Sequence, residues 1–287
     1  MGLEIVVKIL ERPEEFEEAV EVQKRAWGMD DYRDAAPAHL LRALSANGGL
    51  VLGAFVGDRM VGVSYGWVVS TGSDSFFYSH ATGVSEGEKY RGVGFRLKLA
   101  QREWALSRGL RLAKWTFDPL QSLNSYFNLA KLGVIAREYY VNYYGEMRDS
   151  INVGLGSDRV KAEWYLDSRR VEERLASGRK APSAEELEDM GAHVALRPGG
   201  GLHPSEPAID PGAGVVLVGL PGSVSRVREE SLEAAVRWRI ATRKVYEFYM
   251  SRGYLLVDNV VGEDGYRYNV LWRASLDEVL SGSNPWD

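Results

Sequence analysis

The sequence predicts an α/β protein with a first domain and a second, smaller α/β module. Apolar runs of strand length alternate with segments whose apolar residues recur every three to four positions, the spacing of a helix face. A glycine turn at Gly92 and Gly94 joins one such strand, which ends at Val84, to a helical segment that stops at Gly109. A stretch rich in proline and glycine, residues 197–214, separates the two parts.

The composition is that of an ordinary globular protein, since 45% of the 287 residues are hydrophobic and 26% are charged. A net charge of −5 argues against a nucleic-acid-binding surface, and we expect no nucleic-acid partner. The absence of cysteine excludes disulfides, thiolate nucleophiles and cysteine-ligated zinc. The N-terminus turns acidic too early for a signal peptide, and no apolar run is long enough to span a membrane. We therefore expect a cytoplasmic protein that binds no membrane.

The first domain is expected to contain a strand, two helices, three strands, a helix and a strand. The Gly57-Asp58 dipeptide marks a tight hairpin. A helix that connects two strands of one sheet gives a parallel pair with a right-handed crossover, which we expect around the third helix. The expected strands are residues 3–10, 50–56, 60–68, 74–84 and 110–117, and the expected helices are residues 14–27, 37–45 and 94–108.

The segment from Thr82 to Arg108 carries the main functional pattern: a strand end, a glycine turn and a long helix. The first four N–H groups of a helix have no partner within the helix, and with the helix dipole they favour phosphate oxygens. Gly92 and Gly94 would let a phosphate approach the backbone. The alternative is a helix start that binds nothing.

This segment resembles motif A of the GNAT N-acetyltransferases, in which a strand ending in Val precedes Arg/Gln-x-x-Gly-x-Gly/Ala at a helix start. The residues in that register are Val84, Lys89, Gly92 and Gly94. Lys89 stands where the family usually has Arg or Gln. A register that begins at Arg91 would put an arginine in place of the last small residue. Either register gives the loop two cations, which suit a pyrophosphate.

The resemblance implies the GNAT acyl-CoA N-acyltransferase fold, a mixed, mostly antiparallel sheet whose central parallel strands splay apart around the acyl-CoA. It also implies acetyl-CoA as the acyl donor. The strand backbone at Thr82, Gly83 and Val84 would pair with the pantetheine arm. The residues that would hold the pyrophosphate are Lys89, Tyr90, Arg91, Gly92, Val93 and Gly94.

A second resemblance covers a predicted helix at residues 122–132 and a strand expected from residue 134 to 144. The Lys-Leu-Gly sequence that ends at Gly133 matches the end of the family's motif B. Leu129 occupies the position that usually holds Tyr, often the general acid that protonates the leaving CoA thiolate. Asn124 lies near the place of an Asn that contacts the pantetheine arm in the family, about two residues out of register.

Three side chains are candidates for acid–base chemistry: His80, Asp118 and Tyr126. His80 would share a strand face with Thr82 if the alternation is regular, and it could deprotonate an amine. Its alternative is a hydrogen-bonded core histidine. Asp118 could bind the amine, or it could be a turn or helix N-cap residue. Tyr126, nearly one turn before Leu129, is the local candidate for the missing acid. No His, Asp and Glu cluster has metal-ligand spacing, so we expect no metal.

We place the first domain at residues 1–178, a linker at 179–213 and the C-terminal module at 214–287. The Tyr249-x-x-x-Gly253 spacing repeats the pattern that Leu129 breaks. We therefore hypothesise a degenerate half-GNAT repeat that extends the sheet or closes the acceptor site. The alternative is a chance similarity between two helix–strand units. The expected elements after residue 145 are strands at 160–167, 215–220, 254–261 and 266–272 and helices at 169–177 and 232–252.

The sequence thus indicates a member of a GNAT-like branch of predicted acetyltransferases of bacteria and archaea, with the resemblance covering roughly the first 170 residues. We expect direct transfer of an acetyl group from acetyl-CoA to a small-molecule or protein amine in a ternary complex. The alternatives are an inactive CoA-binding sensor or scaffold, which Leu129 favours, and acyl transfer to a hydroxyl acceptor. By resemblance, a homodimer joined through the late strands is also expected.

Overall fold

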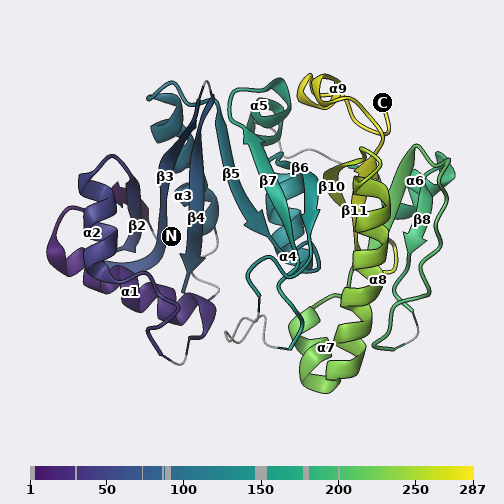
Figure 1. Ribbon diagram of the computed structural model, residues 1–287, viewed down its shortest axis with the longest axis horizontal. Coiled ribbons are helices and arrows are strands. Elements are labelled where there is room, and N and C mark those ends of the chain that lie inside the picture. The colour runs from purple at the N-terminus through teal and green to yellow at the C-terminus, as the bar shows by residue number, and fades with distance from the viewer. Residues whose placement is uncertain are drawn as a thin grey trace. The chain divides into compact units, whose positions relative to one another are not determined.

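The structure is a computed structural model that describes residues 4–29, 31–72, 74–85, 87, 92–145, 154–176, 181–199 and 201–287 (Figure 1). The chain divides into two compact units. Unit 1 comprises residues 1–115 and 148–151, and unit 2 comprises residues 116–147 and 152–287. The division falls inside a strand and not in the stretch rich in proline and glycine that the sequence marks as a linker.

In unit 1, strands β1 to β5 follow one another in the sheet in chain order. Neighbours from β1 to β4 are antiparallel, and β4 and β5 are parallel. The predicted mixed, mostly antiparallel sheet with a parallel pair is therefore confirmed. The strands are β1 (Ile5–Ile9), β2 (Leu50–Val56), β3 (Arg59–Thr71), β4 (Asp74–Val84) and β5 (Leu112–Phe117), and the helices are α1 (Pro13–Trp27), α2 (Ala38–Ala46) and α3 (Val93–Leu106).

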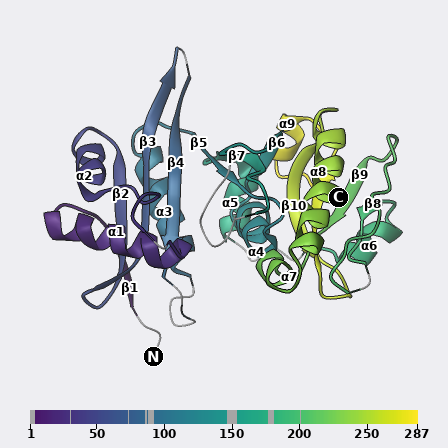
Figure 2. The same ribbon diagram turned by 60° about the horizontal axis from the view of Figure 1, so that its bottom comes forward.

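Helices cover both faces of the unit 1 sheet, with α1 and α2 on one face and α3 on the other (Figure 1, Figure 2). Phe16 of α1 and Leu41 of α2 are buried in one cluster with Val63 of β3. On the opposite face, the ring of Trp104 in α3 lies 5.3 Å from the ring of Phe77 in β4. Both faces of the central strands are therefore buried, and polar side chains there need internal partners.

In unit 2, the strands lie in the order β7-β6-β10-β11-β9-β8. Neighbouring strands are antiparallel except β8 and β9, which are parallel. Helix α8 lies across this sheet (Figure 1), and its Tyr246 stacks on Tyr139 of β6. The strands are β6 (Ile135–Tyr140), β7 (Arg159–Tyr165), β8 (His193–Leu196), β9 (Val215–Gly219), β10 (Leu255–Val261) and β11 (Arg267–Trp272). The helical elements are α4 (Ser122–Ser125), the π-helical segment η2 (Tyr126–Lys131), α5 (Arg169–Ala176), α6 (Ala184–Asp189), α7 (Val224–Glu230), α8 (Leu232–Met250) and α9 (Leu276–Leu280).

Three arginine–aspartate pairs in unit 2 have fully buried carboxylates. Two of the arginines lie one turn apart on α8, and the third lies on α5. Because a buried charge without a partner is very costly, each pair ties its helix to the segment that carries the aspartate. The pairs are Arg239–Asp118, Arg243–Asp158 and Arg174–Asp258, with shortest nitrogen–oxygen distances of 2.6, 2.8 and 2.5 Å.

The helix and strand that the sequence predicts after Asp118 are both shorter than expected. The helix expected over residues 122–132 is α4 followed by η2, in which the Leu132 N–H donates to the Phe127 carbonyl five residues earlier at 3.1 Å. The strand expected to reach residue 144 ends at Tyr140. The chain turns there because the Tyr143 N–H donates to the Ser157 carbonyl at 3.0 Å.

The expected linker at residues 179–213 contains regular structure. α6 begins at a capping box, in which the Glu186 N–H donates to Ser183 and the Ser183 N–H donates to the Glu186 carboxylate. Strand β8 then pairs in parallel with β9. Residues 197–199 and 201–214 have the irregular conformation that their proline and glycine content predicts.

The second module repeats the element order of the segment before it. A helical segment ends at Gly133 and leads into β6 and β7, and α8 ends before Gly253 and leads into β10 and β11. Both glycines have positive φ, 74° and 85°. β6 and β10 are antiparallel, and Ala136 lies opposite Leu256, each three residues after its glycine. A residue that faces its own counterpart marks a local two-fold relation between the two helix–strand units, and the half-GNAT repeat stays a hypothesis.

Among the helices of the described residues, none is both long enough and apolar enough to cross a membrane.

Candidate functional site

The two parallel strands of unit 1 separate after a very short ladder. The described pairs between β4 and β5 are Phe77 with Ala113 and Tyr78 with Lys114. β4 then continues to Val84 alongside β3 only. A fork between parallel strands, open at their carboxyl ends, is where α/β sheets commonly bind ligands. We call this place the β4–β5 fork.

A β-bulge lies in β4 directly beyond the fork. Tyr65 of β3 pairs with Ala81 and the next residue, Gly66, pairs with Ser79, so that His80 is the extra residue. A bulge shifts the alternation of side chains along its strand by one position. Such a shift often re-aims a side chain next to an active site.

The bulge corrects one expectation from the sequence. Thr82 faces α3, because its hydroxyl lies 2.6 Å from the Ser64 hydroxyl, which accepts a bond from Gln101 of α3. His80 faces the α1 side, where its ring lies 5.5 Å from the ring of Tyr65. His80 and Thr82 are therefore on opposite faces of β4. The regular alternation that would have put them together is broken by the extra residue.

His80 lies in an aromatic surrounding that favours its neutral form. Its ring is 5.3 Å from the ring of Trp67 and 6.2 Å from that of Tyr78, in addition to the contact with Tyr65. Burial lowers the pKa of His80 below its ordinary value of 6.5. The imidazole is still exposed at its edge. It is therefore a neutral base near pH 7 that solvent and a substrate can reach.

The strand end expected to pair with pantetheine is half-buried at Thr82 and Val84 and buried at Gly83. A Cβ added at Gly83 would lie 2.7 Å from the ring of Trp27 in α1. The glycine at this position is therefore required by the close approach of α1 to β4. Within the part of the chain that the structure describes, no strand pairs with these three residues on the side away from β3.

The helix expected to bind phosphate starts as predicted. Gly92 is the N-cap residue of α3 with φ 91°, a left-handed conformation that favours glycine. Val93 is fully buried, and Gly94 lies in the first turn. A Cβ added at Gly62 of β3 would lie 2.7 Å from Val93, so Gly62 lets the helix start approach the sheet. The predicted loop residues Lys89, Tyr90 and Arg91 lie outside the described residues.

Asp118, predicted to bind the amine, is engaged by protein groups in unit 2. Its carboxylate accepts two bonds from Arg239, at 2.8 and 2.6 Å, and one from the Leu120 N–H at 2.9 Å. Arg239 in turn donates to the Leu155 carbonyl at 3.1 Å. The turn role that was the alternative for Asp118 is therefore present, and its part in amine binding stays a prediction.

Asn124 and Tyr126 lie in unit 2, at α4 and at the start of η2. Both are exposed, and the Asn124 side chain accepts a bond from Asn128 at 2.8 Å. The guanidinium of Arg267 lies 4.1 Å from the centre of the Tyr126 ring. Leu129 is fully buried and makes up part of the core. The roles of Asn124 and Tyr126 stay predictions.

Two polar residues of α3 at the sheet, Lys98 and Gln101, are not among the functional residues predicted from the sequence. Both are buried against the sheet, with exposed fractions of 4% and 2%. The sequence does indicate that Gln101 is buried, because it lies four residues after Leu97 and three before Trp104, on the apolar stripe of the helix. A polar residue on such a stripe needs a buried partner.

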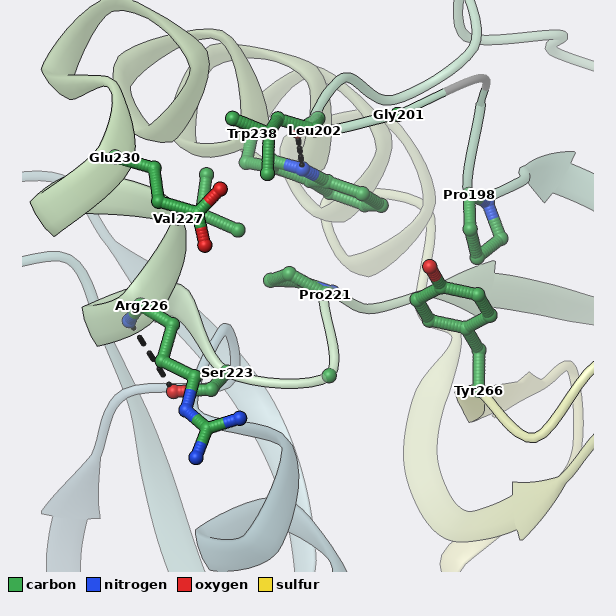
Figure 3. Close-up of a pocket in the computed structure, with 11 residues that line it drawn as sticks. Pro198, Gly201, Leu202, Pro221, Ser223, Arg226, Val227, Glu230, Trp238 and Tyr266 are labelled. Atoms are coloured by element: carbon green, nitrogen blue, oxygen red, sulfur yellow. Dashed lines mark hydrogen bonds between the residues drawn. The ribbon is translucent and has the colours of Figure 1, made fainter.

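A cavity of about 510 Å³ lies within unit 2, where β8 and β9 end (Figure 3). Figure 3 shows Pro198 and Tyr266 on one side and Val227 with Glu230 on the other. The Trp238 side chain lines the cavity and donates to the Leu202 carbonyl at 2.8 Å. Of the residues that the sequence predicts as functional, none of those that the structure describes lines this cavity. The described residues contain no group of three or more His, Asp or Glu that could hold a metal ion.

No protein-family model matches the chain, and no curated protein sequence matches it. Similar solved structures include an aminoglycoside 6'-acetyltransferase type Ii, 15% identical over 57% of this chain and 99% of that chain, with a TM-score of 0.45. A GNAT-family acetyltransferase from Streptococcus pneumoniae is 14% identical over 56% of this chain and 98% of that chain, with a TM-score of 0.45. A GNAT-family acetyltransferase from Brucella melitensis in complex with acetyl-CoA is 19% identical over 40% of this chain and 77% of that chain, with a TM-score of 0.34. All three are acetyltransferases, and the last two are of the family that the sequence motifs resemble.

Proposed function

We propose that this chain is a GNAT-type N-acetyltransferase that transfers an acetyl group from acetyl-CoA to an amine in a ternary complex. The observation that carries the proposal is the β4–β5 fork of unit 1. β4 leaves β5 after Tyr78, bulges at His80, and leads through a glycine turn at Gly92 into the start of α3. These features follow one another in the order in which a thioester, a pantetheine arm and a pyrophosphate follow one another in acetyl-CoA.

Each part of acetyl-CoA would meet a suitable group of the chain. The pyrophosphate would bind at the N-terminal turn of α3, where the helix dipole favours anions. The pantetheine amides would pair with the backbone of Thr82, Gly83 and Val84. The acetyl carbonyl would lie at the bulge, where a backbone N–H can stabilise the oxyanion as the amine attacks.

His80 would act as the base. The amine nitrogen must be neutral to attack the carbonyl carbon, and an imidazole with a lowered pKa can accept its proton directly or through water. The new C–N bond then forms as the C–S bond breaks, and the electron pair leaves with the sulfur. The thiolate takes a proton to give free CoA. Tyr126 is our candidate for the donor of this proton, since Leu129 carries no acidic group.

A second reading is a protein that binds acetyl-CoA without turning it over. The observation that favours it is Leu129, which is fully buried at the position of the family's usual acid. A third reading keeps the catalysis but replaces the amine with a hydroxyl acceptor.

The release of CoA thiol from acetyl-CoA separates these readings. We would measure it with the full chain and matched acceptors: small primary amines, peptides with a free lysine or N-terminus, and the corresponding alcohols. Release that depends on an amine supports the proposal, and release with alcohols alone would replace the amine with a hydroxyl acceptor. Tight binding of acetyl-CoA without release, even by slow hydrolysis, would favour the sensor.

A further inference from the structure

Five polar side chains form a hydrogen-bonded chain between α3 and the sheet of unit 1. Lys98 Nζ donates to Ser79 Oγ at 2.9 Å, and Ser79 donates to Gln101 Oε1 at 3.1 Å. Gln101 Nε2 donates to Ser64 Oγ at 2.6 Å, and the hydroxyls of Ser64 and Thr82 lie 2.6 Å apart. All of these residues except Thr82 are buried. The chain of bonds is an internal polar network in a core that is otherwise apolar.

Lys98 occupies the point at which β4 separates from β5. The last described pair is Tyr78 with Lys114, and the next residues of the two strands are Ser79 and Trp115. Lys98 Nζ contacts both of these, at 2.9 Å from Ser79 Oγ and 3.7 Å from the centre of the Trp115 ring. An ammonium over an aromatic face is attracted to it. One side chain therefore bridges the two strands immediately beyond their last pair.

The same network spans the bulge in β4. Ser79 precedes the extra residue, His80, and Thr82 follows it. Ser64 of β3 binds Thr82 and also donates to the Ala81 carbonyl at 3.0 Å. The strand is thus held from the α3 side on both flanks of His80, while the His80 ring lies on the other face. Loss of the network would leave the bulge without its side-chain support.

Burial of the Lys98 ammonium lowers the stability of the folded state. Lys98 has no carboxylate partner among the described residues, and burial lowers its pKa from 10.5 to about 7. A methionine of similar length would fill the same space without this cost. An ionisable group that is buried at a cost and lies beside a candidate site is a functional candidate.

We propose that Lys98 is a positioning residue for acyl transfer at the β4–β5 fork. Its ammonium holds Ser79 and Trp115 in place, keeps the His80 bulge in register, and puts one positive charge behind the strand on which the thioester would lie. That charge stabilises the negative charge that develops on the carbonyl oxygen, and then on the sulfur that leaves with the electron pair of the C–S bond. The inference rests on the proposed function of the same site.

Among the described side chains that pack between α3 and the sheet at this level, Lys98 is the group that titrates. The residues that β3, β4 and β5 turn toward α3 at this level are Ser64, Ser79, Thr82 and Trp115. The titratable side chains of the same strands belong to the opposite face or are directed away: they are Tyr65, Tyr78, His80 and Lys114. On α3 itself, Arg102 follows one turn later.

The test is calorimetric titration of acetyl-CoA into the wild type, Lys98→Met and His80→Gln at pH 8, in two buffers with different ionisation enthalpies. Acetyl-CoA is anionic, so its binding raises the pKa of a nearby ammonium. The wild type should therefore take up on the order of 0.5 proton per bound acetyl-CoA. His80→Gln should keep this uptake and Lys98→Met should lose it. In turnover, Lys98→Met should lower kcat about tenfold and remove the alkaline limb of the kcat/KM pH profile near pH 7, since kcat/KM reports the free enzyme.

Thermal unfolding supplies the control for folding. Between pH 7 and 10.5 the unfolded state binds more protons than the folded state, so Lys98 lowers stability most below pH 7. Lys98→Met should therefore melt above the wild type at pH 6. Equal proton uptake in the wild type and Lys98→Met, or an unchanged alkaline limb, would overturn the inference and leave the proposed function intact. Failure of the wild type to bind acetyl-CoA would overturn the proposed function itself. A variant that melts below the wild type at pH 6 would contradict the cost of the buried ammonium and would count against the inference.

Discussion

His80 and Lys98 lie on opposite faces of β4, at the point where this strand leaves β5. Burial lowers the pKa of both side chains. The two have opposite requirements, because His80 must be neutral to accept a proton and Lys98 must be charged to stabilise the developing anion. Activity should therefore be limited at low pH by His80 and at high pH by Lys98. We therefore expect a bell-shaped pH profile of kcat/KM, with its maximum slightly below pH 7.

His80→Gln tests the first of these limits. Glutamine keeps a polar side chain of similar size but cannot accept the proton at neutral pH. We expect kcat to fall by about 10² to 10³ and the acid limb of the profile to disappear, because general base catalysis contributes typically that much. The KM for acetyl-CoA should change little. An unchanged acid limb in a folded variant would assign the base to another group.

Asp118→Asn distinguishes structural from substrate-binding roles of this aspartate. The substitution leaves the buried Arg239 guanidinium without its carboxylate, so we expect a loss of about 3 to 5 kcal/mol in the free energy of unfolding. Asp31→Asn, which removes the carboxylate of the exposed pair with Arg33, should leave the free energy of unfolding almost unchanged. Denaturant unfolding measures both. A stable Asp118→Asn protein with a raised KM for the amine would restore the predicted role in binding.

The residues that the sequence could identify are those that belong to a local pattern. Gly92 and Val93 stand where the glycine turn predicts, because a tight turn before a helix leaves a trace in consecutive positions. The orientation of His80 could not be predicted, since a bulge adds one residue without a sequence signal of its own. The partner of Asp118 is 121 residues away on α8, and no local spacing indicates such a pair.

At the scale of elements, β4 begins and ends as predicted, at Asp74 and Val84. The segment η2 was missed because a π-helical turn uses the same residue types as an α-helix and differs only in the bonds it makes. The sequence does contain a signal for α6, the capping box of Ser183 and Glu186. The glycine and proline content of the surrounding segment predicts a linker instead, and this prediction hides the helix.

The contact between α1 and β4 can be tested at Gly83. A Cβ there would lie 2.7 Å from the Trp27 ring, so Gly83→Ala must displace α1 or the strand. We expect a loss of about 1 to 3 kcal/mol in unfolding free energy, the usual cost of overpacking. Gly214→Ala is the matched control, because no atom lies within 4 Å of the added Cβ and its φ is not positive. Equal stability of the two variants would show that α1 does not pack on β4 as described.

At the scale of the whole molecule, the C-terminal module completes the core of the segment before it. β6 lies between β7 and β10, so its edge is already paired within the chain. A homodimer joined through β6 would need that edge. Both edges of β6 are paired within the chain, so a homodimer through this strand would have to break one of these pairings. The repeat hypothesised from the sequence stays a hypothesis, and the sequence could not predict the register that places Ala136 opposite Leu256.

Truncation at residue 178 tests whether the first domain is independent. Without residues 179–287, Asp118 loses Arg239, Asp158 loses Arg243, and β6 has an open edge. Because uncompensated buried charges each cost several kcal/mol, about as much as the whole stability of a typical domain, we expect fragment 1–178 to be unfolded or insoluble. Co-expression with residues 179–287 should restore a soluble complex. Circular dichroism of a soluble, cooperatively melting 1–178 fragment would instead support the domain boundary expected from the sequence.

The most direct measurement is a calorimetric titration of acetyl-CoA into the wild type, Gly94→Glu and Ser107→Glu. Gly94→Glu places a carboxylate in the first turn of α3, where the pyrophosphate would bind, and Ser107→Glu adds the same charge at the other end of the helix. The account predicts tight binding to the wild type and to Ser107→Glu, and a loss of at least tenfold in affinity for a folded Gly94→Glu. Absence of binding to the wild type, or equal affinity for all three proteins, would contradict it.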